Sequence, residues 1–157
     1  MNILNVREYI ETFLKIRTKD GTLMPLRLNQ PQDRMYQAVK SQWDAGKPVR
    51  IIVLKARQMG FSTLTEAIIF AITATRFYTD CMIVAHKDEA TANLFRMSLR
   101  YYENLPEPMK PMRKASNAHE LVFDKPAHYK GRRPGLGSSI KCATAGGSGV
   151  GRSATLR

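Results

Sequence analysis

The sequence has only two cysteines, and their positions bear on whether it could hold a disulfide or a zinc ion. Cys81 and Cys142 stand far apart in apolar runs and form no CxxC pair, which argues against a disulfide framework or a zinc site. We expect two reduced thiols. The sequence also lacks a membrane-length apolar run, because its longest one, near residues 67–74, is too short to cross a bilayer, and no signal-peptide core is present. We expect a soluble, intracellular protein with no membrane partner.

Acidic residues are also scarce, with 13 Asp and Glu against 25 Lys and Arg and a formal net charge of +12. A polyanion is the partner that this balance favours, since cations that neutralise phosphates release counterions. The length of 157 residues suits one domain with a single core.

Helical periodicity dominates the first third of the chain. Residues 5–16 place an apolar stripe on one face, and residues 28–46 predict a second helix with Pro31 in its first turn and Gly46 at its end. Between them, Asp20-Gly21 predicts a turn.

From Val49 onward, apolar runs alternate with helical stretches. "VRIIVL" and "CMIVA" are continuously apolar, as in parallel strands covered on both faces, and a helix over residues 62–76 would join them. A further helix is predicted over residues 88–104. "ELVF" and "SSIKCATA" predict two later strands. The fold class is therefore α/β with a mainly parallel sheet, and an alternation that stops after about four strands predicts an incomplete sheet.

One stretch has the arrangement of a phosphate loop. "IIVLKARQMGFSTLTEAII" predicts a strand, a tight turn and a helix. Against G-x-x-x-x-G-K-[ST], Gly60 fits the second glycine and Ser62 the hydroxyl, but Phe61 occupies the lysine position and Lys55 that of the first glycine.

Such a loop needs backbone N–H groups, a helix N-terminus and a cation around the phosphates. Lys55 or Arg57 could supply the cation, and Ser62 or Thr63 could offer a hydroxyl to Mg²⁺ or cap the helix. The alternative is an ordinary strand-to-helix turn in which Gly60 relieves strain and Ser62 caps the helix.

The complete string "KARQMGFST" resembles the deviant Walker A motif of the large terminase subunits of tailed bacteriophages. The resemblance implies that Lys55 takes the Walker lysine's role, with Arg57 as the motif arginine and Ser62 as the Mg²⁺-side hydroxyl. "LRLNQPQDRMY" resembles that family's adenine-recognition segment, in which Gln32 would read the adenine edge; the alternative is a solvent-facing Gln32. The implied nucleotide-binding residues are Gln32, Lys55, Ala56, Arg57, Gln58, Met59, Gly60, Phe61, Ser62 and Thr63.

The resemblance implies a P-loop NTPase core. Residues 1–47 would supply flanking helices and the adenine side, and residues 48–157 part of the ATPase core. The implied function is the ATP-binding part of a DNA-packaging motor, with ATP and Mg²⁺ as cofactors. The implied partners are double-stranded DNA, the portal protein and the small terminase subunit. A homo-oligomeric ring in the bacterial host cytoplasm, transiently at the procapsid portal, is also implied.

The acidic residues that such an ATPase needs for hydrolysis have no convincing match in this sequence. "TAGGSGVGRSATLR" resembles the run that precedes the family's Walker B strand, so the Walker B Asp and Glu are expected after residue 157. Asp124 follows a short apolar run, and Asp88 with Glu89 fits a helix N-terminus better than a catalytic strand. We therefore expect a catalytically incomplete chain.

Two other functions stay open. One is a helicase-like nucleic-acid translocase, and the other is a non-catalytic basic module that binds nucleic acid or the portal. The basic run of Lys130, Arg132 and Arg133 could contact a nucleic-acid backbone or form a solvated loop. The histidines, His86, His119 and His128, lack metal-ligand spacing, and the glycines near residue 149 do not fit a dinucleotide motif.

Overall fold

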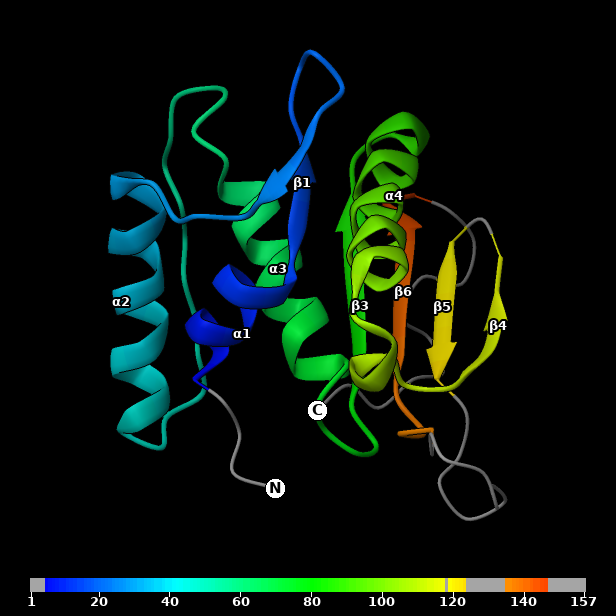
Figure 1. Cartoon of the computed structure of the whole chain (residues 1–157). Helices are drawn as coiled ribbons and strands as arrows, with labels where there is room; N and C mark the ends of the chain where they lie inside the picture. Colours follow the sequence, from blue (N-terminus) through cyan, green and yellow to red (C-terminus); the bar gives the residue numbers. More distant parts are fainter. Residues whose placement is uncertain (1–4, 118, 124–134, 147–157) are drawn as a thin grey trace.

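The computed structural model describes residues 5–117, 119–123 and 135–146. Figure 1 shows a sheet with helix α4 packed on it and the other helices to one side. The elements in chain order are α1 (Val6–Phe13), β1 (Lys15–Arg17), β2 (Leu23–Pro25), α2 (Gln30–Asp44), α3 (Phe61–Thr73), β3 (Asp80–Ala85), α4 (Asp88–Asn104), a 3-10 turn (Glu107–Met109), β4 (Arg113–Ser116), β5 (Glu120–Phe123) and β6 (Ser139–Thr144).

The larger sheet is mixed, so the predicted mainly parallel sheet is wrong. Its strand order is β3-β6-β5-β4, and β3 pairs with β6 in parallel, whereas β6 with β5 and β5 with β4 pair antiparallel. β4, which the sequence did not predict, is joined to β5 by only three residues. A connection this short can join antiparallel strands but not parallel ones.

The predicted strand over residues 49–54 is also absent. This segment precedes α3 but is assigned to no strand of either sheet. Its apolar residues are not covered on both faces as expected, because Ile51 packs against the core while Ile52 and Leu54 are fully exposed, at 100% and 102%. An apolar run predicts strand-forming residues, but pairing also requires a neighbouring strand.

The helices lie where they were predicted, but α1 ends at Phe13 and α3 at Thr73, each three residues before its predicted end. α4 spans the predicted residues 88–104, and α3 lies within one residue of its predicted start. α3 is the most apolar helix and is buried over most of its length, and it packs against α1, α2 and α4. The start of α3 is consequently held from several sides.

A small hairpin of β1 and β2 was missed, although its turn at Asp20-Gly21 was predicted. Lys15 pairs with Pro25 and Arg17 with Leu23 in an antiparallel register. Three-residue strands carry too little alternation to be recognised. Among the described residues, no helix has both the length and the apolar character needed to cross a membrane.

Candidate nucleotide site

Residues 55–60, which the sequence predicts to be a phosphate loop and which keep that name below, turn the chain sharply into α3. The backbone of Gln58 has φ 64° and that of Gly60 has φ 75°, both in the left-handed region. Gly60 is the N-cap of α3 and no side chain caps this helix, so the predicted capping by Ser62 or Thr63 does not occur. The N–H groups of the first turn have no intrahelical acceptor and are therefore suited to an anion.

The predicted cations and hydroxyl lie around this helix end. Lys55, Arg57 and Ser62 are all exposed. Within the described part of the chain, neither Lys55 nor Arg57 forms an ion pair. Both cations are therefore free to meet an anionic ligand, and the structure does not choose between them.

Gln32 contacts the phosphate loop directly. It is 4% exposed, and its side-chain Nε2 donates to the carbonyl oxygen of Gly60 across 2.8 Å. Its Oε1 accepts from the backbone N–H of Asn29 at 3.0 Å, and the Asn29 side chain accepts from the backbone N–H of Gln32, which completes a capping box at the start of α2. Both ends of the Gln32 amide are thus engaged, and the solvent-facing alternative is wrong.

The fit between Gln32 and Gly60 leaves no room for a side chain. A Cβ atom built on Gly60 would lie 2.6 Å from Gln32 Nε2. The Asn29 side chain also donates to the carbonyl of Met59, at 3.4 Å. The start of α2 and the phosphate loop therefore form one packed unit.

A cleft of about 430 Å³ adjoins this unit. It is bounded by the start of α2, the extended segment before the loop, and the residues on either side of Gly60. Its lining residues are Gln30, Pro31, Arg34, Met35, residues 51–56, Met59 and Phe61. The apolar side chains could cover a flat ring system, and Arg34 adds a further cation.

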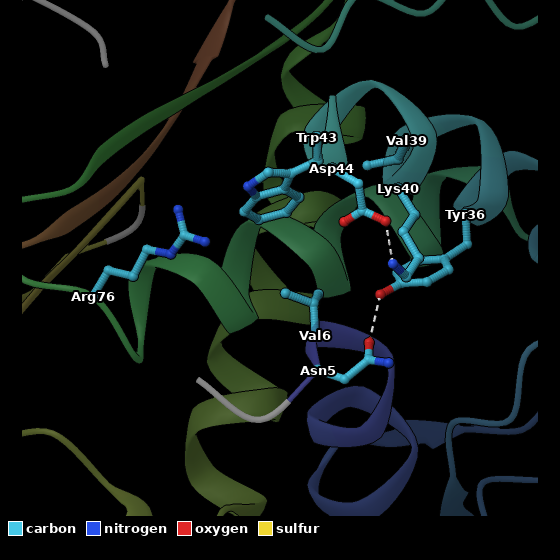
Figure 2. Close-up of a pocket in the computed structure, with 8 residues that line it drawn as sticks. All are labelled: Asn5, Val6, Tyr36, Val39, Lys40, Trp43, Asp44 and Arg76. Carbon is cyan, nitrogen blue, oxygen red and sulfur yellow. Dashed lines mark hydrogen bonds and ion pairs between the residues drawn. The ribbon is translucent and has the colours of Figure 1, made fainter. Parts of the chain in front are cut away.

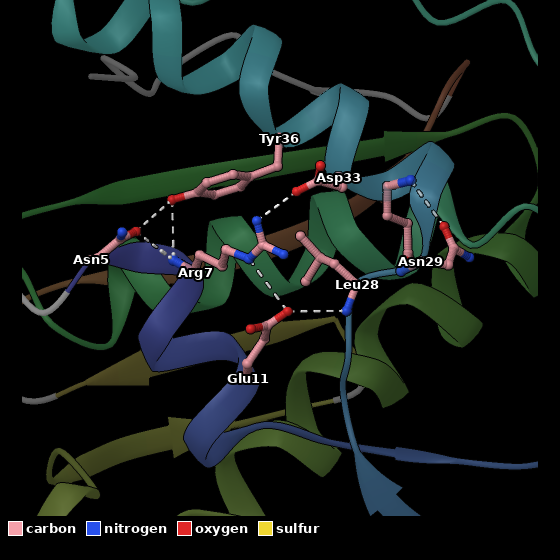
Figure 3. Close-up of polar contacts among 8 residues, drawn as sticks. Asn5, Arg7, Glu11, Leu28, Asn29, Asp33 and Tyr36 are labelled. Carbon is pink, nitrogen blue, oxygen red and sulfur yellow. Dashed lines mark hydrogen bonds and ion pairs between the residues drawn. The ribbon is translucent and has the colours of Figure 1, made fainter.

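A polar network holds α1 against the start of α2 (Figure 3). The Arg7 guanidinium pairs with Asp33 at 2.5 Å and with Glu11 at 3.4 Å. Glu11 also accepts from the backbone N–H of Leu28, just before the α2 cap, at 3.3 Å. The Tyr36 hydroxyl accepts from the backbone N–H of Arg7. Through these contacts α1 fixes the segment that carries Gln32.

A buried carboxyl lies one turn into α3, behind the phosphate loop. Glu66 is 1% exposed, and burial raises its pKa to about 7. Its hydrogen bond from the Ser98 hydroxyl of α4 opposes this rise. Burial raises the pKa values of Tyr101 on α4 and Cys142 on β6, and the nearby Glu66 carboxyl adds to both rises. No motif in the sequence indicates this acid, because it lies within an apolar helix.

A second cleft, of about 330 Å³, lies at the other end of α2 (Figure 2). The Arg76 guanidinium carbon lies 4.6 Å from the centroid of the Trp43 ring. Lys40 and Asp44 form an ion pair at its wall, and the Tyr36 hydroxyl donates to the Asn5 side chain at 2.8 Å. No sequence motif falls in this cleft.

Several predicted residues lie away from the site or outside the described residues. Asp88 and Glu89 occupy the first turn of α4, as expected of helix-capping acids, and Asp88 accepts from the Thr144 hydroxyl at 2.5 Å. Asp124, His128 and the basic run at residues 130–133 lie outside the described residues. The described residues hold no cluster of three potential metal ligands. Cys81 and Cys142 are free thiols, as predicted.

Asn29 was missed by sequence reasoning although a signal for it exists. Asn29 and Gln32 have the spacing of a capping box, in which a polar cap is followed three residues later by Glu or Gln. That pattern would have indicated that the Gln32 side chain turns back to the backbone instead of pointing into solvent.

Comparison with known proteins gives a match in structure but none in sequence. No protein-family model and no curated protein matches the sequence. The chain is similar to the crystal structure of the HK97 bacteriophage large terminase, with a TM-score of 0.68 and 20% sequence identity. The match covers 90% of this chain and 27% of that chain, so the chain spans about a quarter of the terminase's length. This chain therefore has a terminase-like fold.

Proposed function

We propose that this chain is the ATP-binding part of a viral DNA-packaging motor. The observation that supports this most strongly is the N-terminus of α3, which has no side-chain cap and follows a loop whose two cations form no ion pair with the described residues, in a terminase-like fold. Double-stranded DNA, a portal protein, a small terminase subunit and a ring of copies in the bacterial host cytoplasm belong to the same proposal.

The residues at the loop fit a nucleotide triphosphate with Mg²⁺. First-turn N–H groups of α3 would bind phosphate oxygens, and Lys55 would neutralise the terminal phosphates, with Arg57 beside it. The Ser62 hydroxyl, exposed in the first turn, would reach the Mg²⁺ ion. Bound MgATP would supply the phosphoryl group whose transfer drives the motor.

The adenine is assigned to the cleft beside α2, which Gln30, Pro31 and Arg34 line. Gln32 does not line this cleft, but it keeps one amide hydrogen beyond its bond to Gly60, so a small movement of its side chain would let it contact an adenine edge. We assign the acids that activate water to a strand outside these 157 residues. That strand would also give residues 49–54 a pairing partner, which the described strands do not provide.

Titration of a fluorescent ATP analogue in the presence of Mg²⁺ tests the assignment. Lys55→Ala should weaken binding by about tenfold or more, because a phosphate contact by a cation contributes at least about 1.4 kcal/mol. Lys47→Ala removes an exposed lysine after α2 and serves as the matched control. Equal ATP binding by the unaltered chain, Lys55→Ala and Lys47→Ala would contradict the proposal and favour a non-catalytic module. Loss in Arg57→Ala instead of Lys55→Ala would move the cation's role to Arg57.

A further inference from the structure

The β1–β2 hairpin is anchored at its base and extends away from the core. Leu14 and Leu26 at its base are buried, and the Leu26 N–H donates to the Leu14 carbonyl at 2.9 Å. In Figure 1 its tip lies at the end of the molecule where β3 and β6 terminate and α3 begins. The hairpin is thus held by two buried leucines while most of its length is exposed.

Positive charge is concentrated on this hairpin. Residues 15–27 contain four cations, Lys15, Arg17, Lys19 and Arg27, against the single acid Asp20. All four cations are exposed, and within the described residues none of them forms an ion pair. Elsewhere on the described residues Arg7, Lys40 and Lys110 do form ion pairs with acids.

Asp20, the single acid of this hairpin, forms its hydrogen bonds within the turn. Asp20 accepts from the Thr18 hydroxyl and from the Thr22 N–H, and the Thr18 contact lowers the pKa of Asp20 most. The Thr18 N–H also donates to the Thr22 carbonyl at 2.9 Å. These bonds fix the turn, so the cations are presented on a preformed scaffold.

The strand register sorts the side chains by face. Ile16 packs against the core, whereas Lys15 and Arg17 point to the opposite face with their cross-strand partners Pro25 and Leu23. Two residues apart on one strand, Lys15 and Arg17 lie roughly 6.6 Å from each other along it. The solvent face of the hairpin therefore presents Lys15 and Arg17 side by side, with Lys19 at the turn.

We propose that this hairpin binds the phosphate backbone of duplex nucleic acid. A two-stranded ribbon has the width that the major groove of B-DNA admits, and its unpaired cations complement the duplex charge. The identity of the duplex as DNA follows from the proposed motor function, but the surface is separate from the nucleotide site. The contact would be independent of sequence, because cations on phosphates carry no base readout.

Fluorescence anisotropy of a labelled 20-base-pair duplex with the full chain and no nucleotide tests the hairpin. The triple variant K15Q/R17Q/K19Q should weaken binding by at least about tenfold at 50 mM salt. Its plot of log affinity against log salt should be shallower by up to about 2.7, which is three phosphate contacts at about 0.9 each. Circular dichroism verifies that each variant is folded.

The matched control K47Q/R50Q/K114Q removes the same charge from exposed sites outside the hairpin. Equal weakening in both triple variants would overturn the proposal in favour of general electrostatic attraction. Unchanged duplex binding by the hairpin variant would overturn it as well. A simultaneous loss of self-association in sedimentation would then assign the surface to contacts between copies of this chain. Because no nucleotide is present in this assay, duplex binding is measured separately from ATP binding, so a failure of the hairpin proposal is distinguishable from a failure of the nucleotide site.

Discussion

The side-chain amide of Gln32 and the carbonyl of Gly60 are joined by a 2.8 Å hydrogen bond that links helix α2 to the phosphate loop. The two residues are 28 positions apart in the sequence. The contact makes the adenine side and the phosphate side of the proposed site mechanically dependent on each other.

Gly60→Ala should destabilise the chain and loosen the loop. The left-handed backbone alone costs about 1–2 kcal/mol for alanine. The added Cβ would also lie 2.6 Å from Gln32 Nε2, so the Gln32 amide would have to move away. Gly46→Ala is the matched control, since Gly46 has φ 65° and no atom near a new Cβ. Urea unfolding should show a larger loss for Gly60→Ala. In a Gln32→Ala background the two glycine variants should cost the same, and a persistent difference would refute the coupling.

Helix positions could be predicted from the sequence because they depend on local information. An apolar stripe with helical spacing begins after Asp88, and Pro106 cannot continue a helix, so the two together define α4. Gly60 followed by an apolar run defines the start of α3. Strand pairing could not be predicted in this way. Whether β5 runs parallel or antiparallel depends on partners far away in the chain, and residues 49–54 need a neighbour that no local pattern reveals.

The candidate site was predictable in composition but not in contacts. The motif predicted that Lys55, Arg57 and Ser62 act together at the start of α3, and in the structure all three side chains are exposed. It did not foresee that Gln32 is held by Gly60, or that Glu66 is buried behind the loop. Both features arise from tertiary packing between separate helices.

Glu66 should make the stability depend on pH. Its folded pKa of about 7 exceeds the ordinary value of 4.5, so the neutral carboxyl's contribution is complete below 4.5 and is lost as the pH rises through 7. The total change is on the order of 3 kcal/mol. Glu66→Gln should remove this loss when urea unfolding is measured at pH 5 and pH 8. The exposed Glu103→Gln is the control, and a Glu66→Gln protein that still loses stability like the parent would refute the assignment.

The exposed face of residues 49–54 should promote association. The double variant Ile52→Ser/Leu54→Ser removes two fully exposed apolar side chains and should raise solubility, with a stability change within about 0.5 kcal/mol. Ile51→Ser, on the side that packs against the core, should instead destabilise the fold. Sedimentation and thermal unfolding distinguish the two effects. Undiminished association of the double variant would show that another surface is responsible.

The chain of 157 residues should release no phosphate from ATP above background. Asp88 accepts a hydrogen bond from Thr144 in the first turn of α4, where Glu89 also lies, and the described residues hold no cluster of three potential metal ligands. A phosphate-release assay beside Lys55→Ala measures this. Clear release that depends on Lys55 would mean that Asp124 or the pair Asp88 and Glu89 supplies the catalytic acid after all.

Hydrogen exchange measured with and without MgATP tests the central claim most directly, because it locates the nucleotide on the chain. The account predicts slower exchange of the amides from residue 56 to residue 63 and at the start of α2, and no change in Lys55→Ala. Protection confined to the cleft of Trp43 and Arg76, or no protection at the phosphate loop at saturating MgATP, would contradict it.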